Sequence, residues 1–147
     1  MKKILGTLLC ASFLLSASDL EWANSACKEG DGGGCAMLGA MYLNGVGVKQ
    51  NHKKALNFYL KGCNYGNSLA CTGVSLVIFN SDVVEKDYKK AAKYAKKGCS
   101  WGDKFGCSML GGMYYDGIGV EQDFDKAKQY FKKSCKMGYK EDCKLAE

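Results

Sequence analysis

The cysteines recur with a fixed period, and this spacing restricts the fold more than any other feature of the sequence. Eight of the nine cysteines form four pairs whose members are eight residues apart, and each pair lies thirty-six residues after the one before it. The pairs are Cys27 and Cys35, Cys63 and Cys71, Cys99 and Cys107, and Cys135 and Cys143. A period in the thirties is typical of solenoids built from helix pairs. The spacing therefore predicts an all-α solenoid of antiparallel helix pairs.

The first eighteen residues have the composition of a secretory signal peptide. Two lysines follow Met1, an apolar stretch runs over 4–15, and small residues occupy 16–18. An apolar run of this length is shorter than the roughly twenty residues that a membrane-spanning helix needs, and no second candidate follows it. We expect residues 1–18 to be removed and the remaining chain to be secreted or periplasmic, with no membrane span.

Removal of this segment leaves only the paired cysteines. Cys10 lies within it, so eight cysteines remain, and the net charge falls from +6 to +4. An even number of cysteines in a small exported chain indicates a disulfide framework. The alternative is zinc ligation, but zinc sites favour close C-x-x-C pairs together with histidine, and His52 is the only histidine. We therefore expect four disulfides, no metal site and no cofactor.

The geometry of a disulfide requires the chain to reverse between the two cysteines of each pair. Pairing with the partner eight residues away is the arrangement that gives every repeat the same environment. Along one helix this separation is about 12 Å, whereas the Cα atoms of bonded cysteines lie about 4.4 to 6.8 Å apart. Three turns place a helix-ending glycine before a helix-starting Asp or Asn, at Gly30-Asp31, Gly66-Asn67 and Gly102-Asp103. The fourth turn, Gly138-Tyr139, keeps only the glycine.

The same period divides the mature chain into units. A half-repeat over 19–34 is followed by three repeats over 35–70, 71–106 and 107–142 and by a stub over 143–147. Each repeat is expected to hold a first helix, a loop and a second helix, and the second helices open at the N-cap residues Asn51, Asp87 and Asp123. The stub is expected to start a further helix. Because it is short, it leaves part of the last repeat uncovered, which favours a dimer through the C-terminal end.

The repeat resembles the Sel1-like repeat, a relative of the tetratricopeptide repeat. It reads GCxxLGxMYxxGxGV, then Asp-x-x-Lys-Ala and an aromatic pair, and the first and third repeats fit best. The second repeat departs, with Ser75 in place of the first glycine and Ser81-Asp82-Val83-Val84 in place of the glycine-rich loop, so a different loop shape is expected. With the export signal and the cysteine pairs, the closest resemblance is to the Helicobacter cysteine-rich proteins. This resemblance implies a right-handed superhelix with a concave groove.

Helical spacing separates two sets of residues on each first helix. One set recurs at i, i+3 and i+4, as the core between two packed helices should. Its members are Leu38, Met41 and Tyr42, then Val74, Val77 and Ile78, then Leu110, Met113 and Tyr114. The other set is Gly33, Ala36, Ala40, Leu43 and Asn44, with counterparts Leu69, Thr72, Leu76, Phe79 and Asn80, and Phe105, Ser108, Gly112, Tyr115 and Asp116.

The second set gives the candidate binding site, because the resemblance to tetratricopeptide repeats implies that it lines the concave groove. The candidate residues are Leu43, Asn44, Leu76, Phe79, Asn80, Ser108, Tyr115 and Asp116. Aromatic anchors beside amide groups suit an extended peptide, since Asn can both donate to and accept from a backbone. The expected ligand is a peptide, a cell-wall fragment or a protein partner. Small and apolar residues replace the Lys and Asn of a carboxylate clamp. The alternative is that these residues only pack on the next repeat.

The lysines gather on the second helices. Two clusters are Lys89, Lys90, Lys93, Lys96 and Lys97, and Lys126, Lys128, Lys132 and Lys133. A solvated outer face is the simplest interpretation, and attraction to a wall or membrane surface is the alternative. Nucleic acid is not expected as a partner, because the chain is exported and has no arginine for bidentate contacts with bases.

The resemblance also implies an enzymatic alternative, since members of that family bind and slowly hydrolyse penicillin-type β-lactams. Serine β-lactamases combine the motifs S-x-x-K, S-D-N and K-T-G. This chain has one S-x-x-K match, from Ser25 to Lys28, and neither of the other motifs. No catalytic residue is identified, so the β-lactamase hypothesis rests on the resemblance alone. Ligand binding in the groove is the first hypothesis and β-lactam hydrolysis is the alternative.

Overall fold

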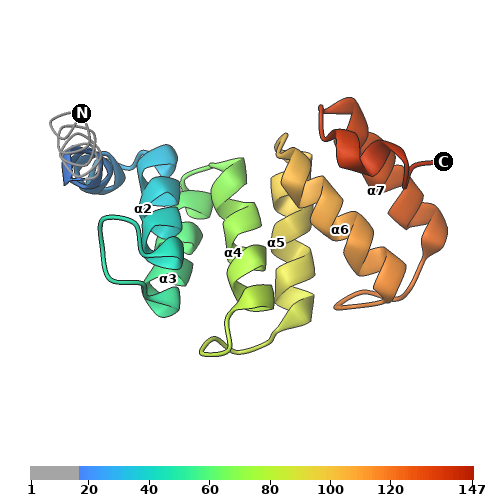
Figure 1. The fold of residues 1–147 in the computed structure, drawn as a ribbon, viewed down its shortest axis with the longest axis horizontal. Coiled ribbons are helices and arrows are strands. Elements are labelled where there is room, and N and C mark those ends of the chain that lie inside the picture. Colours follow the sequence, from blue (N-terminus) through green and yellow to red (C-terminus); the bar gives the residue numbers. More distant parts are fainter. Residues whose placement is uncertain (1–16) are drawn as a thin grey trace, which may run out of the picture.

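The computed structural model describes residues 17–147 and shows a row of helices (Figure 1). The predicted signal peptide, residues 1–18, lies outside this part of the chain except for its last two residues. A helix over 17–28 is followed by α2 (Gly32–Asn44), α3 (His52–Asn64), α4 (Ser68–Asn80), α5 (Tyr88–Ser100), α6 (Lys104–Asp116), α7 (Phe124–Lys136) and the 3-10 helix η1 (Lys140–Cys143). The described residues contain no strand. The prediction of an all-α solenoid is confirmed.

Consecutive helices form antiparallel pairs, and the pairs stack side by side. The pairs within one repeat are α2 with α3, α4 with α5, and α6 with α7. The first helices also contact one another, because α4 packs on both α2 and α6. These three first helices therefore form one layer of the solenoid.

All four predicted disulfides are present, and each bridges a turn between two helices. The Cα atoms of the bonded cysteines lie 4.6, 4.6, 4.4 and 4.9 Å apart along the chain. The glycines of the four turns have positive φ angles of 87° to 98°, which favour a residue without a side chain. After three of them the next helix is capped by a side chain, and the capping residues are Asp31, Asn67 and Asp103. The glycine with positive φ and the polar capping residue after it together reverse the direction of the chain.

The fourth turn differs from the other three. Tyr139 follows Gly138 and makes no side-chain cap, and the chain then forms only the short 3-10 helix Lys140–Cys143. The expectation that the stub 143–147 starts a further helix is therefore wrong: residues 144–146 form turns. Without a side chain to accept the first free N–H groups, an α-helix has no favourable start at this position.

The predicted N-caps of the second helices are confirmed. The side chains of Asn51, Asp87 and Asp123 accept hydrogen bonds from the backbone N–H three residues later, at 2.9, 3.0 and 2.9 Å. At the third cap, the N–H of Lys126 holds the pKa of the Asp123 carboxyl below its usual value, and the Lys126 ammonium group adds to this effect.

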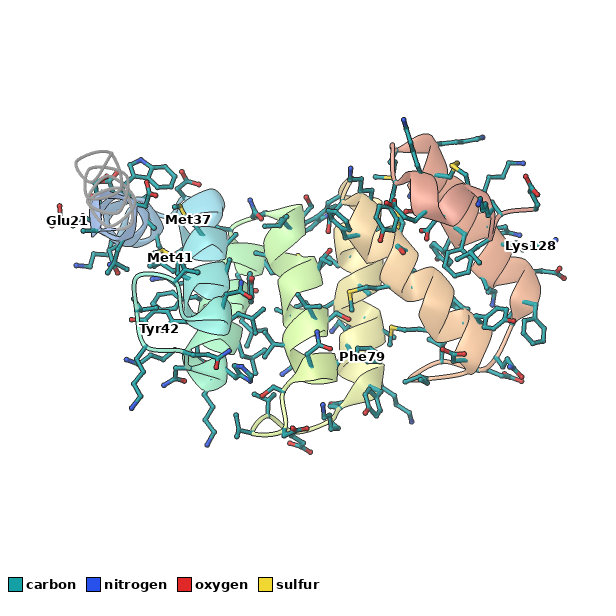
Figure 2. The ribbon with its side chains drawn as sticks, in the orientation of Figure 1. Glu21, Met37, Met41, Tyr42, Phe79 and Lys128 are labelled. Atoms are coloured by element: carbon teal, nitrogen blue, oxygen red, sulfur yellow. A yellow bond between two sulfur atoms is a disulfide. The ribbon has the colours of Figure 1, made fainter. Side chains whose placement is uncertain are left out.

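The predicted core is confirmed, and side chains fill the spaces between neighbouring helices along the row (Figure 2). Leu38, Val74, Val77, Ile78 and Leu110 are each at most 1% exposed. In the first and third repeats the tyrosine of this set stacks on an aromatic ring of the second helix. The ring pairs are Tyr42 with Phe58, 5.5 Å between centroids, and Tyr114 with Tyr130, 5.6 Å.

Complementary sizes fix how the two helices of a repeat approach each other. A methyl group added at Gly39 would lie 2.7 Å from the ring of Tyr59, and one added at Gly73 in the next repeat would also meet this ring. The corresponding pair in the third repeat is Gly111 with Phe131. In the second repeat the glycine becomes Ser75 and the aromatic residue becomes Ala95, both fully buried. A larger residue on one helix is thus matched by a smaller one on the other.

Tyr59 is 4% exposed, and its burial raises the pKa of its hydroxyl to about 12. Burial disfavours the charged form of a phenol, so the ring stays neutral at every pH below that value. The aromatic contact between the first and second repeats is therefore insensitive to pH in the physiological range.

The loop of the second repeat has the different shape that its sequence predicts. Gly45 and Gly117 end their helices with φ angles of 67° and 69°, whereas the corresponding Ser81 has an extended backbone with φ −98°. Ser81 is fully buried, and its hydroxyl lies 2.8 Å from Nδ1 of His52 in the preceding repeat. The only histidine therefore joins two repeats.

Four disulfides indicate an oxidising environment, since cytosolic thiols are normally kept reduced. None of the helices in the described residues combines the length and the apolar character needed to cross a membrane.

Two neighbouring glycines of α6 should respond in opposite ways to an added methyl group. For Gly111→Ala we expect a fall of about 1 to 2 kcal/mol in the free energy of unfolding, because the methyl group would lie 2.8 Å from two carbon atoms of the Phe131 ring. For Gly112→Ala we expect a rise of about 0.5 to 1 kcal/mol, because no atom lies within 4 Å of the new Cβ and alanine favours helix. Urea denaturation with the disulfides intact measures both. Equal changes would contradict the size matching at Gly111.

The C-terminal disulfide should be the first to open under mild reduction. Cys135 and Cys143 are half-buried, whereas the other six bonded cysteines are buried, and a thiolate must reach the sulfur that it attacks. We expect low dithiothreitol concentrations to expose these two thiols first. Alkylation followed by peptide mass spectrometry measures the order, with unreduced protein as the control. Earlier labelling of Cys63 and Cys71 would show that access does not set the order.

Candidate binding groove

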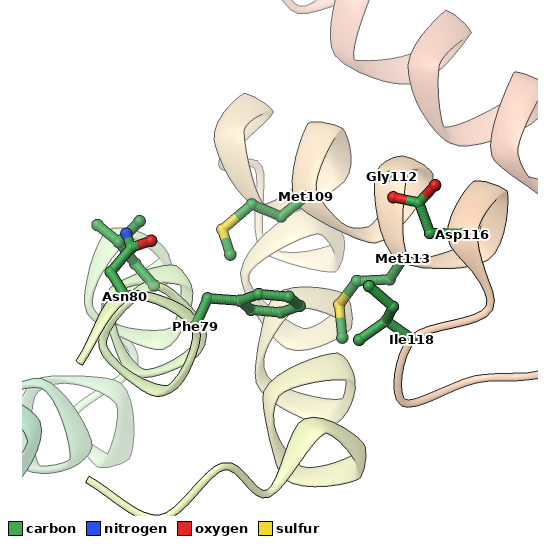
Figure 3. A pocket seen from close by; sticks show the side chains of 8 residues that line it. Phe79, Asn80, Met109, Gly112, Met113, Asp116 and Ile118 are labelled. Atoms are coloured by element: carbon green, nitrogen blue, oxygen red, sulfur yellow. The ribbon is translucent and has the colours of Figure 1, made fainter. Parts of the chain in front are cut away.

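A pocket lies between the C-terminal halves of α4 and α6. It has a volume of about 290 Å³ and is lined by Leu76, Phe79, Asn80, Met109, Gly112, Met113, Asp116 and Ile118. We call it the first pocket. Phe79 and the two methionines face one another across it, with Asn80 on the α4 side and Asp116 on the α6 side (Figure 3). Its floor is apolar, and polar groups stand on both walls.

A second pocket adjoins the first towards the N-terminal ends of the same two helices. Its volume is about 320 Å³, and Leu76 and Met109 line both pockets. The other residues of this second pocket are Tyr59, Leu69, Thr72, Gly73, Asp103, Phe105, Ser108 and Tyr139. The two pockets together form one groove that follows α4 and α6 from the disulfide turns to the helix C-termini.

The structure brings five of the eight candidate residues to this groove. Leu76, Phe79, Asn80 and Asp116 line the first pocket, and Leu76 and Ser108 line the second. Their positions one or two helical turns apart on parallel helices explain why a repeat alignment finds them together.

The other three candidates lie apart from it. Leu43 is partly buried against the core, and the amide of Asn44 donates to the Ala40 carbonyl at 2.9 Å. Tyr115 packs edge-on against Phe124, with 5.2 Å between ring centroids. Of the three aligned residues Leu43, Phe79 and Tyr115, only Phe79 therefore lines the groove. The groove-lining Phe79 makes the equivalent ring contact with Tyr88, 5.1 Å between centroids, so Tyr115 differs from Phe79 in lining neither pocket and not in its ring contact.

Several groove residues were missed by sequence reasoning. Met113 was assigned to the core alone, yet it is both buried and part of the first pocket. Met109, Ile118, Asp103 and Tyr139 lie outside the aligned set and reach the groove from α6 and the turns beside it. A signal was present for Met109, because it lies one helical turn before Met113.

A side-chain hydrogen bond to a backbone carbonyl recurs at the C-terminal end of each first helix and holds that end in place. Gln50 donates its side-chain amide to the Leu43 carbonyl at 2.7 Å, and Gln122 donates to the Tyr115 carbonyl at 2.9 Å. At the same position of the second repeat, the ammonium group of Lys86 donates to the Phe79 carbonyl at 2.6 Å. Each of these hydrogen bonds satisfies a carbonyl that the helix end leaves free, and thereby fixes the backbone at the C-terminal end of the helix.

The polar groups on the walls of the first pocket have no partner within residues 17–147. Neither the Asn80 amide nor the Asp116 carboxylate makes a side-chain hydrogen bond or ion pair there. In the second pocket the Asp103 carboxylate is engaged, because it accepts a hydrogen bond from the Gly106 N–H at 3.2 Å as the cap of α6. The first pocket thus offers the free polar groups.

The residues considered for catalysis do not converge. The Ser25 hydroxyl donates to Glu29 at 3.3 Å on an exposed helix face, and neither Ser25 nor Lys28 lines the groove. His52 contacts the buried Ser81. Within the described chain no group of three or more metal-ligating side chains could hold an ion.

The lysines of the second helices lie largely in solvent, in keeping with the interpretation of a solvated outer face. Lys89, Lys90, Lys93 and Lys96 are exposed, and Lys97 lies over the ring of Trp101 at 4.7 Å from its centroid. The one ion pair among the described residues joins Lys126 to Asp123 at 3.5 Å.

Comparison with known proteins identifies the repeats. The family model described as Sel1 repeat matches residues 33–67, 68–103 and 105–139. Comparison with curated protein sequences gave no match.

Three solved structures are similar to this fold. A Sel1 repeat protein from Oxalobacter formigenes has a TM-score of 0.79 and 25% identity, with 86% of this chain and 51% of that one covered. The protective antigen c5321 of uropathogenic Escherichia coli has a TM-score of 0.77 and 28% identity, with 86% of this chain and 27% of that one covered. Helicobacter pylori cysteine-rich protein B has a TM-score of 0.70 and 28% identity, with 88% of this chain and 92% of that one covered. This chain thus spans about half of the first protein and about a quarter of the second.

Sel1 repeat proteins are typically scaffolds for protein interactions. The stacked helix pairs, the glycines at their close contacts and the three matched segments together show that the chain belongs to the Sel1 repeat family.

Proposed function

We propose that this protein binds an extended peptide segment of a partner protein in the groove between α4 and α6. The observation that carries the proposal is the pair of adjoining pockets that share Leu76 and Met109. In an extended peptide alternate side chains point the same way and lie roughly 7 Å apart. Two such side chains can occupy the two pockets while the backbone crosses the shared wall.

The chemistry of the groove supports a peptide in preference to a small polar ligand. Phe79, Met109 and Met113 form an apolar surface, and methionine adapts its shape to different side chains. Asn80 can donate to a peptide carbonyl and accept from a peptide N–H with the same amide group. An apolar anchor beside a backbone-binding amide is the arrangement that holds a segment without requiring a fixed sequence.

We further propose that the protein works outside the cytoplasm, secreted or periplasmic. The four disulfides and the signal-like composition of residues 1–18 support this location. A cell-wall peptide as ligand and a dimer through the C-terminal end stay predictions. β-Lactam hydrolysis is not proposed, because the serine–histidine contact that the described residues show, Ser81 with His52, has a fully buried serine and lines neither pocket of the groove.

A substitution that fills the first pocket tests the proposal without disturbing the fold. Gly112 lines this pocket, and no atom lies within 4 Å of where its Cβ would be. For Gly112→Leu we expect the helix to be at least as stable, while the new side chain takes the space of the ligand anchor. Peptides selected from a displayed random library on the wild-type protein should bind the variant at least about tenfold more weakly, as for loss of an anchor. Fluorescence polarisation measures the affinity.

The matched control is Gln129→Leu, which places the same side chain on an exposed position of α7. We expect it to leave peptide affinity unchanged, and circular dichroism should show both variants folded. Equal binding by the wild-type protein and the folded Gly112→Leu variant would refute binding in this groove.

A further inference from the structure

We propose that the groove selects basic segments: the bound peptide carries a Lys or Arg whose cation pairs with the Asp116 carboxylate. This inference rests on the proposed function, because it specifies the peptide that the same groove takes. The pattern we infer has an apolar side chain in each of the two pockets and a basic residue at the Asp116 end.

Asp116 is a carboxylate whose position the fold does not explain. It is the last residue of α6, where the partial negative charge of the helix end disfavours an acidic side chain. The equivalent residues of the other repeats, Asn44 and Asn80, are neutral. Asp116 also makes no hydrogen bond or ion pair with any other residue of 17–147, unlike the capping Asp87 and Asp123. Asp116 is exposed, so its carboxylate is accessible to a cation on a bound ligand.

The surroundings of the first pocket leave this charge uncompensated. The net charge of the chain is +6, yet no lysine is among the described residues that line the two pockets. Two lysines contact groove residues from outside the pockets: Lys86 donates to the Phe79 carbonyl, and Lys104 lies over the ring of Phe105 at 5.3 Å. Neither makes an ion pair with Asp116, so a cation on the ligand meets a carboxylate that no lysine of the described residues pairs with.

The order of groups along the groove fits one pattern of side chains. Following α6, the second pocket begins at Phe105, Met109 lies between the pockets, and Asp116 stands at the far wall of the first pocket. The distance along the helix from Phe105 to Asp116 is about 16 Å at 1.5 Å per residue. Five residues of extended chain, with alternate side chains facing the groove, span about 13 Å. Apolar, any, apolar, any, basic is the sequence that places three successive groove-facing side chains on these three positions.

The partial negative charge at the C-terminal end of α6 strengthens the preference for a basic residue in the peptide. The carbonyl groups of the last helical turn point in the same direction as the axis, and their partial charge adds to that of the Asp116 carboxylate. An acidic segment, or a segment whose terminal carboxylate enters this end, is repelled. The groove therefore has the opposite charge preference from a carboxylate clamp.

A double-mutant cycle tests the pairing. The probe is a fluorescently labelled peptide selected from the random library on the wild-type protein, together with its Lys→Gln or Arg→Gln version. With wild-type protein we expect the Gln version to bind about two- to fivefold more weakly, the size of an exposed ion pair, with a difference that shrinks as salt is raised. With Asp116→Asn both versions should bind equally. The control Asp125→Asn, an exposed acid on α7, should preserve the difference.

The outcomes separate this inference from the proposed function. If selected peptides show no enrichment in basic residues, or if the loss caused by Gln is the same in wild-type and Asp116→Asn protein, the basic pattern is wrong. If the basic pattern is wrong but Gly112→Leu still abolishes peptide binding, the proposal that peptides bind in the groove is retained. If Gly112→Leu binds all peptides as the wild-type protein does, the groove proposal fails and this inference fails with it. Asp116→Asn relieves a charge at a helix end, so loss of folding does not obscure the result.

Discussion

The disulfide-bridged turn is the constraint on which the rest of the structure depends. A glycine with positive φ reverses the chain, the next residue caps the following helix, and the bridge holds the two helix ends within 4.9 Å between Cα atoms. The glycine and the bridge occur at all four turns and the cap at three of them, so covalent links help to set how one helix pair follows the next. In a solenoid each unit contacts only its neighbours, and such links replace the large central core of a globular domain.

Within this frame, the fit between repeats comes from side-chain volume. The first and third repeats place an aromatic ring on a glycine, whereas the second places an alanine opposite a serine. The ring of Tyr59 also packs against Gly73 of α4, so a neighbouring repeat supplies part of the side-chain volume in the second repeat. The second repeat can therefore differ from its neighbours in its loop and in the first helix without breaking the stack. Its α4, with Leu76 and Phe79, forms one wall of the groove.

Positive and negative side chains lie on different parts of the molecule. Most lysines of the described residues lie on the second helices, and the wall of the first pocket carries a carboxylate without an ion-pair partner. A basic outer face keeps the protein away from other cationic surfaces in general. The groove, by contrast, has an apolar floor and a local negative charge, so the two surfaces favour different contacts.

The sequence by itself determined the helix pairs, the four disulfides, the caps and the core, because each depends on residues close together in the chain or on a strict period. It also identified Leu76, Phe79, Asn80, Ser108 and Asp116 as groove residues, since equivalent helix positions face the same side. Only the tertiary structure decided that Tyr115 turns to Phe124, that the two methionines form the floor, and that the last turn stays a 3-10 helix. Period fixes which positions are equivalent, whereas the space left by neighbouring side chains decides what each position does.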